Sequence, residues 1–258
     1  MKGYSIFDYF GYMIPMYERY KLICRSGFDS VSLGWAGYPD NPNETKHLNP
    51  ELARKVGLNI ENIHTPFEGA NKFWMDLIDG DEYLDSQISC IHDCAVHSIQ
   101  TMVLHISQGA IQPDVTPIGI KRLNQLVEEA ERYNIDLAFE NMRDPKHLRY
   151  ILNNIKSERV KFCFDSGHQN CRTPENDILS LFGDRVAAVH LHDNDGIKDQ
   201  HNLPFDGTIK WKEIMSKLRG VNYSGTIALE VINDSYNDYT PQDFLKLAYD
   251  RAKLLSNL

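Results

Sequence analysis

The sequence predicts an α/β protein that folds as a single (β/α)8 TIM barrel. Short β-rich runs alternate with helical patterns along the whole chain, and eight such runs can be counted. The length of 258 residues is typical of one α/β barrel. No Pro-, Gly- or Ser-rich linker divides the chain, so residues 1–258 are expected to form one domain. An open, doubly wound sheet is the alternative, but no G-x-G-x-x-G follows the first strand and no P-loop is present.

The eight strand candidates are short runs of aliphatic, β-branched and aromatic residues. In chain order they span residues 4–7, 29–33, 59–64, 100–106, 135–140, 160–165, 186–192 and 226–231. Eight strands that are separated by helices and joined by short connections close most economically into a barrel.

Helical patterns fill the chain between these strands. They span residues 14–26, 51–57, 81–98, 117–133, 211–218 and 241–255, and two more begin near residues 145 and 174. The segment at 117–133 is the clearest, since Pro117 starts it and one apolar stripe runs along it, formed by Leu123, Leu126, Val127 and Ala130. Two long loops are expected, a Pro- and Asn-rich one at residues 38–50 and another at 65–74.

Composition and charge favour a cytoplasmic protein with a sizeable core. Apolar residues make up 42% of the chain, and the formal net charge of −9, with no basic cluster, argues against nucleic acid as a partner. Asp8 and Glu18 interrupt the apolar character of the N-terminal segment, so it does not resemble a signal peptide, and no other run is long enough to span a membrane. The five cysteines show no zinc-ribbon or secreted-scaffold spacing, which suits a reducing compartment.

The segment at residues 186–207 carries the densest set of metal-capable side chains. Its first residues alternate as a strand does, so His190 and His192 share one face. The polar loop that follows adds further candidate ligands, namely Asp193, Asp195, Asp199 and His201. A solvated acidic loop beside two hydrogen-bonded core histidines is the alternative interpretation. Imidazoles and carboxylates gathered at the end of a strand suit a divalent cation better than a core.

The same arrangement recurs at the ends of six consecutive predicted strands. These strands deliver, in chain order, His64, His105, Glu140, Asp165, His190 and Glu230. Asn141 follows directly on one of them and His168 comes three residues after another. Each residue alone has an ordinary explanation as a hydrogen-bonded core or rim side chain. Burying all of them on one rim without compensating charge would be very costly, and a bound cation supplies that compensation. Mn²⁺ or Zn²⁺ suits these donors, with Mg²⁺ and Co²⁺ as alternatives.

Several motifs resemble those of the xylose-isomerase-like TIM barrel superfamily. They are HTPFEGAN, AFEN, CFDSGH, VHLHDND, DQHNLPFDGTIKW and ALEV. The superfamily includes sugar phosphate isomerases and epimerases, ketose 3-epimerases, inosose-processing enzymes, and the AP endonuclease family 2 with endonuclease IV. The resemblance extends over essentially the whole chain, and it implies the TIM barrel fold and, from family habit, a homodimer.

The resemblance also implies roles for individual residues. The shared metal site would be Glu140, Asp165, His190 and Glu230. His190 is preferred to His192 because the family pattern His-x-x-acid fits His190 and Asp193. In the ketose epimerases the two metal-bound glutamates are also the acid/base pair, and the histidine matching His168 contacts substrate oxygens. The arginine that follows their metal histidine has no counterpart here, and Lys198 or Gln200 is the nearest candidate.

The endonuclease pattern implies additional metals. It would place a second ion on His64, His105 and Glu140, and a third on His168, Asp199 and His201, and all these residues are present. A similar Asp-x-His loop also occurs in many sugar-isomerase-like members. The chain lacks an evident basic surface for gripping DNA, and its loops look short for intercalation.

The expected function is a metal-dependent isomerase or epimerase acting on a small sugar or sugar phosphate. A divalent cation would acidify the C–H beside the carbonyl, and Glu140 and Glu230 would move the proton through an enediolate. Further candidate substrate contacts are Trp35, Phe67, Trp74, Asn141 and Lys198, of which the three aromatic residues are equally well explained by packing. A zinc-dependent endonuclease that hydrolyses phosphodiesters is the first alternative. A non-catalytic barrel that binds metal and sugar is the second.

Overall fold

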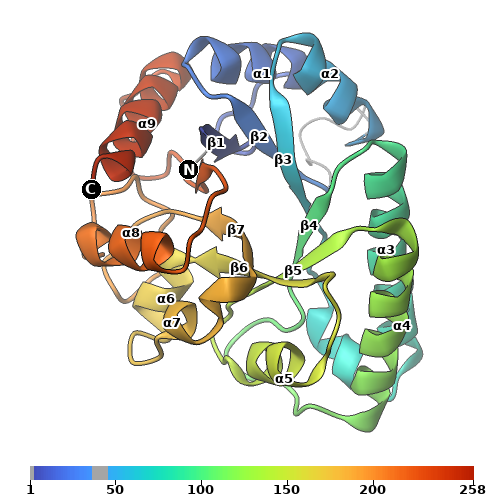
Figure 1. Cartoon of the computed structure of the whole chain (residues 1–258). Coiled ribbons are helices and arrows are strands. Elements are labelled where there is room, and N and C mark those ends of the chain that lie inside the picture. The colour runs from blue at the N-terminus through green and yellow to red at the C-terminus, as the bar shows by residue number, and fades with distance from the viewer. Residues whose placement is uncertain (1–2, 37–45) are drawn as a thin grey trace.

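Eight parallel strands form one sheet in the order β7-β6-β5-β4-β3-β2-β1-β8. The computed structural model describes residues 3–36 and 46–258. Because strands that follow one another in the chain are also neighbours in the sheet, each connection crosses the outside of the sheet, and the helices surround the strands as a ring (Figure 1). The predicted TIM barrel is confirmed.

The strands are close to their predicted positions. They are β1 Tyr4–Phe7, β2 Ser30–Gly34, β3 Asn59–His64, β4 Thr101–Leu104, β5 Asp136–Glu140, β6 Val160–Asp165, β7 Val186–His190 and β8 Ile227–Leu229. Between β7 and β8 the barrel is joined by a single bridge from Leu191 to Leu229. There the Leu191 amide donates to the Ala228 carbonyl at 2.9 Å, and the Glu230 amide donates to Leu191 at 3.3 Å.

The helices also follow the prediction, apart from the segment between β6 and β7. They are α1 Met16–Arg25, α2 Asn49–Lys55, α3 Ile78–Val96, α4 Pro117–Tyr133, α5 Lys146–Asn154, α6 Ser166–Arg172, α7 Ile178–Phe182, α8 Trp211–Gly220 and α9 Pro241–Ser256. The prediction of one helix from residue 174 missed α6, which starts directly after β6 because the Asp165 carboxylate caps it by accepting from the His168 amide at 2.6 Å.

Short 3-10 turns occupy parts of the expected loops. They are η1 Lys46–Leu48 and η2 Ala70–Trp74, and a third turn, η3 Gly183–Arg185, lies directly before β7. Most of the loop predicted at residues 38–50 lies outside the described residues. No helix in the described part of the chain is both long enough and apolar enough to span a bilayer.

The alternation of side chains along the strands separates two layers. Outward residues such as Val31, Leu33 and Ile63 join the main core between the barrel and the helices. Inside the barrel, a second apolar cluster is formed by Val103, Ala138, Cys163 and Ala188. Two residues further along each of these four strands or its extension stands a metal-capable side chain, respectively His105, Glu140, Asp165 and His190. The inner apolar cluster therefore forms the floor under a ring of polar residues.

Candidate functional site

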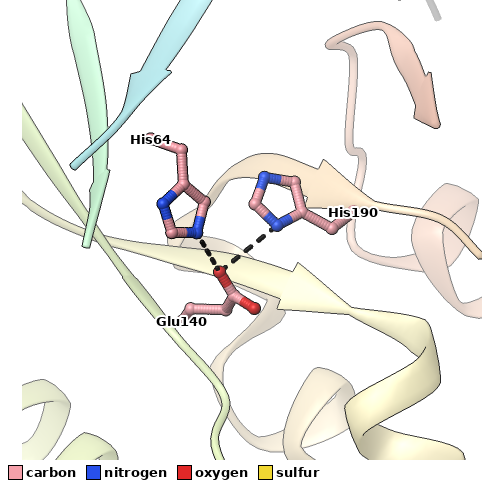
Figure 2. A group of neighbouring side chains, drawn as sticks. All are labelled: His64, Glu140 and His190. Atoms are coloured by element: carbon pink, nitrogen blue, oxygen red, sulfur yellow. Dashed lines mark ion pairs between the residues drawn. The ribbon is translucent and has the colours of Figure 1, made fainter. Parts of the chain in front are cut away.

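Glu140, the last residue of β5, is the centre of a buried histidine cluster. Its Oε2 lies 3.4 Å from Nε2 of His64, 3.2 Å from Nε2 of His105 and 3.2 Å from Nδ1 of His190. Figure 2 shows His64 and His190 next to each other, each with one ring nitrogen turned toward this carboxylate. Burial by itself would raise the pKa of Glu140, but the neighbouring imidazoles, His105 foremost, hold it well below its ordinary value. Glu140 is therefore ionised and ready to bind a cation.

The four residues of the predicted metal site come together in the folded chain. Candidate ligand atoms of Glu140, Asp165, His190 and Glu230 all lie within 4.8 Å of one another. His190 Nδ1 lies between the two glutamates, 3.2 Å from Oε2 of Glu140 and 3.3 Å from Oε2 of Glu230. The residues belong to or directly follow β5, β6, β7 and β8, so the barrel itself sets their spacing.

The donor chemistry of this group fits a divalent cation. His190 is almost fully buried, and neither of its ring nitrogens makes a hydrogen bond of good geometry to another described residue. Asp199 Oδ1 and Nδ1 of His192 are buried and without such a partner as well. Buried polar atoms that lack hydrogen bonds are costly, whereas imidazole nitrogen and carboxylate oxygen are common ligands of divalent metals. A bound cation would satisfy Nδ1 of His190, the ring nitrogen that faces Glu140 and Glu230.

A second group of metal-capable residues faces the same space. Candidate ligand atoms of His192, His201 and Glu230 lie within 4.8 Å of one another. The His192 ring stacks on that of His201 at 3.9 Å between centroids, and its Nε2 lies 3.1 Å from Oδ2 of Asp165. Asp199 lies within 3.9 Å of both imidazoles.

His168 links the two groups. Its Nδ1 lies 3.0 Å from Oε1 of Glu140, and its Nε2 lies 2.9 Å from Oδ2 of Asp199. Burial would lower the pKa of His168, but Asp165, Asp199 and Glu140 raise it well above its ordinary value. In the absence of a metal, a protonated His168 balances part of the negative charge of these carboxylates.

Part of this cluster lines a cavity of about 360 Å³ at the carboxyl end of the barrel. Its lining consists of His64, Phe67, His105, Gln108, Gly109, Glu140, Met142, Arg143, His168, Arg172, Asp199, His201 and Glu230. The volume is within the range of small-molecule sites. A larger hollow of about 780 Å³ lies on the outside along α8, and none of the clustered histidines and carboxylates lines it. The chemistry of the molecule is therefore concentrated in the smaller cavity.

Comparison with known proteins identifies the family. Residues 21–252 match the family model described as xylose isomerase-like TIM barrel. This chain belongs to the xylose isomerase-like TIM barrel family.

Proteins of other organisms are similar to this chain in sequence over most of its length. The chain is 27% identical over 214 residues to an uncharacterized protein of Methanocaldococcus jannaschii, a match that covers 74% of this chain and 70% of the relative. It is 21% identical over 270 residues to fructoselysine 3-epimerase of Escherichia coli O157:H7, with 94% of both chains covered.

Solved structures share the fold at lower identity. D-psicose 3-epimerase from Clostridium cellulolyticum H10, determined with D-tagatose, superposes with a TM-score of 0.80 at 11% identity and covers 99% of this chain and 98% of its own. The IOLI protein, determined with a zinc atom, gives a TM-score of 0.73 at 15% identity and covers 98% of this chain and 96% of its own.

Two tryptophans suggested as substrate contacts lie elsewhere in this xylose isomerase-like barrel. Trp35 is buried and its Nε1 donates to Oδ2 of Asp93 at 2.7 Å. Trp74 is also buried, donates to the Ile106 carbonyl at 2.6 Å and faces the ring of His147. Neither tryptophan belongs to the described lining of the cavity, so both act as packing residues, whereas Phe67 lines the cavity.

Asn141 and Lys198 are also outside the cavity lining. The Asn141 side chain accepts from the Asp165 amide at 2.7 Å and donates to the Asp165 carbonyl at 2.9 Å, which joins the ends of β5 and β6. Lys198 lies in the exposed turn after β7, where its amide donates to Asp195. Asn141 therefore positions a neighbouring carboxylate.

Asp193, on which the preference for His190 over His192 was based, has a structural role. Oδ2 of Asp193 accepts hydrogen bonds from Nε1 of Trp211 at 2.8 Å and from the Phe205 amide at 3.0 Å. Its Oδ1 accepts from the Ile209 amide at 3.1 Å. Asp193 thus fixes the loop between β7 and α8, while His190 and His192 both face the cluster.

The cavity-lining residues that were not predicted from the sequence lie beyond the strand ends, four of them in loops and Arg172 at the end of α6. Gln108, Gly109, Met142, Arg143 and Arg172 line the cavity, and none of them was expected there. Arg143 follows Glu140 by three residues and Arg172 ends the helix that Asp165 caps. Their closeness to strand ends was the available signal, but it does not determine where a loop side chain points.

Proposed function

We propose that this protein is a divalent-metal-dependent sugar isomerase or epimerase that transfers a proton through an enediolate. The observation that carries the proposal is the position of His190 Nδ1 between Glu140 at 3.2 Å and Glu230 at 3.3 Å. Glu140 and Glu230 both contact His190, and both line a cavity that is large enough for a sugar. The reaction needs a base and an acid on the two sides of the substrate, and these two carboxylates would supply them. The names of the fructoselysine and D-psicose 3-epimerases support the same class of reaction.

The metal would be held by Glu140, Asp165, His190 and Glu230. A divalent cation held there would supply charge that acidifies the C–H bond of the hydroxyl-bearing carbon beside a carbonyl. Mn²⁺ suits the oxygen-rich donor set, and the zinc atom in the related IOLI structure makes Zn²⁺ the second candidate. Mg²⁺ and Co²⁺ also fit these ligands.

The two glutamates would divide the proton transfer between them. Glu140 is enclosed, with 1% of its side chain exposed, and Glu230 opens to the cavity with 12% exposed. One carboxylate removes the proton from the carbon beside the carbonyl, and the other returns a proton to that carbon or to its neighbour. His168, which lines the same cavity, would orient a substrate oxygen. We also propose that residues 1–258 work as one catalytic domain, because β1 pairs with β8.

Deuterium uptake tests the reaction directly. The Mn²⁺-loaded protein is incubated in D₂O with a panel of ketoses, and deuterium is expected on the carbon beside the carbonyl, because a carboxylate base exchanges its proton with solvent. Glu140→Gln and Glu230→Gln are expected to lower kcat by roughly a hundredfold or more, the usual scale for a lost general acid or base. Glu213→Gln on the exposed side of α8 is the matched control and should leave kcat unchanged. Turnover without deuterium uptake would contradict the enediolate and indicate a hydride shift.

Hydrolysis of phosphodiesters is a second candidate, favoured by one specific observation. Nε2 of both His64 and His105 lies within 3.4 Å of Glu140, and Asp199 lies within 3.8 Å of both His168 and His201. These contacts would allow one or two further ions. Elemental analysis separates the two functions: about one metal per chain favours the isomerase, and about three favour the endonuclease. Cleavage of abasic DNA without any action on sugars would overturn the isomerase proposal.

A further inference from the structure

Two arginines line the cavity without an ion-pair partner in the described part of the chain. Arg143 is exposed in the loop after β5, and Arg172 is the half-buried last residue of α6. Neither guanidinium makes a hydrogen bond or an ion pair to another residue among residues 3–36 and 46–258. The acidic residues of the site instead face histidines, as Glu140 and Asp199 do. The positive charge of the two arginines is thus left for a ligand.

The two arginines belong to one sector of the barrel rim. Arg143 follows β5 and Arg172 follows β6, and these two strands are hydrogen-bonded neighbours. Gln108 in the next loop along the rim, after β4, lines the same cavity, and its backbone is fixed by the Asn71 side chain at 2.9 and 3.0 Å. The side-chain amide of Gln108 therefore adds a neutral donor to the lining of the same cavity.

We propose that the site selects a substrate that carries an anionic group, a phosphate or a carboxylate, which Arg143 and Arg172 bind while the sugar carbonyl reaches the buried carboxylate cluster. Guanidinium groups present a planar fork of donors that matches the oxygens of both anions. This inference rests on the proposed function, since it names the substrate class of the same site. It makes Arg143 and Arg172 determinants of specificity that do not take part in proton transfer.

Charge and size support this assignment. A cavity lined by Glu140, Asp199 and Glu230 repels an anion, and a bound divalent cation compensates only part of that charge. An anionic substrate therefore needs a cationic anchor, and the two arginines of the cavity lining provide it. The volume of about 360 Å³ accommodates one small sugar with one charged group. A neutral sugar would leave both guanidinium groups without a role.

Turnover of matched substrates tests the proposal. The Mn²⁺-loaded protein is given neutral ketoses, ketose phosphates and keto sugar acids of the same carbon number, and deuterium uptake is measured. One of the two anionic sets is expected to react with a higher kcat/KM than the neutral ketoses. The identity of that set shows whether the site binds a phosphate or a carboxylate. Arg143→Ala and Arg172→Ala should each raise KM for that set about tenfold or more, the scale of a lost charge-assisted hydrogen bond, with little effect on kcat. Arg25→Ala at the exposed end of α1 is the matched control.

A binding measurement separates this inference from the proposed function. Titration of inorganic phosphate into the Mn²⁺-loaded protein should give an affinity that falls about tenfold or more in Arg143→Ala and Arg172→Ala and stays unchanged in Arg25→Ala. Phosphate binding that depends on both arginines, with no sugar turned over, would support the anion site and reject the isomerase. Efficient turnover of neutral ketoses, with phosphate binding unaltered in both variants, would overturn the anion site and leave the isomerase in place.

Discussion

At the residue scale, Asp165 and His192 of the metal-ligand cluster are held in place by neighbours that are not themselves candidate ligands. Asn141 makes both hydrogen bonds to the Asp165 backbone, and the Ser166 hydroxyl donates to the His192 carbonyl at 2.9 Å. Gly167 lets the His192 ring lie directly against the backbone of α6. Such supporting contacts determine how accurately the ligand atoms are placed.

The Gly167→Ala substitution tests this close approach. An added Cβ would overlap the ring of His192, which must then move away from Asp165. We expect reduced metal affinity, by about tenfold or more as for other supporting residues of metal sites, together with a lower Tm. The control is Gly220→Ala, because a Cβ at Gly220 meets no atom within 4 Å. Equal metal affinity in the two variants would contradict the proposed packing role.

His147 provides a pH dependence that is independent of the site. Burial, with a smaller effect of Lys146, lowers the pKa of His147 from 6.5 to about 4. In the unfolded chain the imidazole binds a proton near its ordinary pKa, so folding should lose stability as the pH falls from about 6.5 toward 4. Urea unfolding at pH 7 and pH 5 measures the loss, which should be smaller in His147→Leu. An identical loss in both proteins would exclude His147 as the cause.

At the element scale, one buried arginine joins α4 to the segment between η2 and α3. Arg122 Nη1 donates to the carbonyls of Phe73 at 3.0 Å and Met75 at 2.6 Å, and Nη2 donates to Leu77 at 2.9 Å. Its Nε pairs with Asp81 at 2.8 Å. These contacts fix the backbone of the segment that leads from η2 to α3 on the outside of the barrel.

Removal of this arginine should destabilise the protein strongly. Arg122→Met leaves three carbonyl groups without their donor, and we expect the free energy of unfolding to fall by about 3 kcal/mol. Arg132→Met, on the same helix but exposed, should change it by less than about 0.5 kcal/mol. Urea denaturation of both variants measures the difference. Similar values would mean that the buried hydrogen bonds contribute little.

At the scale of the whole molecule, the cluster exists only when the barrel is closed. Glu140 comes from β5 and Glu230 follows β8, and β8 is held by β1 on one side and by the bridge to Leu191 on the other. A ligand that joins these strands binds the folded barrel and not the unfolded chain. Metal binding is therefore expected to stabilise the entire fold.

Metal removal tests this coupling. A metal at 100 times its Kd stabilises the folded state by about 2.7 kcal/mol, so Mn²⁺ should raise the Tm and a chelator should lower it again. Asp165→Ala should abolish the metal-dependent shift, since one ligand is lost and the remaining carboxylates repel one another. Asp250→Ala, at an exposed ion pair, should keep the shift. A metal-dependent shift that persists in Asp165→Ala would remove Asp165 from the metal site.

The ends of the strands and the ring of histidines and carboxylates that follows them could both be predicted from the sequence. Side chains two apart on a strand share a face, so an apolar residue such as Ala138 predicts where Glu140 points. The same period relates Cys163 to Asp165 and Ala188 to His190. The helix α6 was missed because its start depends on the Asp165 cap, whereas Pro174 gave a stronger local signal.

The sequence by itself determined the barrel and the inward row of carboxylates and imidazoles, because regular secondary structure has a fixed period. Only the tertiary structure decided which side chains beyond the strand ends reach the cavity. Arg143 and Arg172 turn to it, while Asp193 turns to Trp211 and Trp35 turns to the helix layer. A loop has no period, so the direction of its side chains follows from contacts with residues that are distant in the chain.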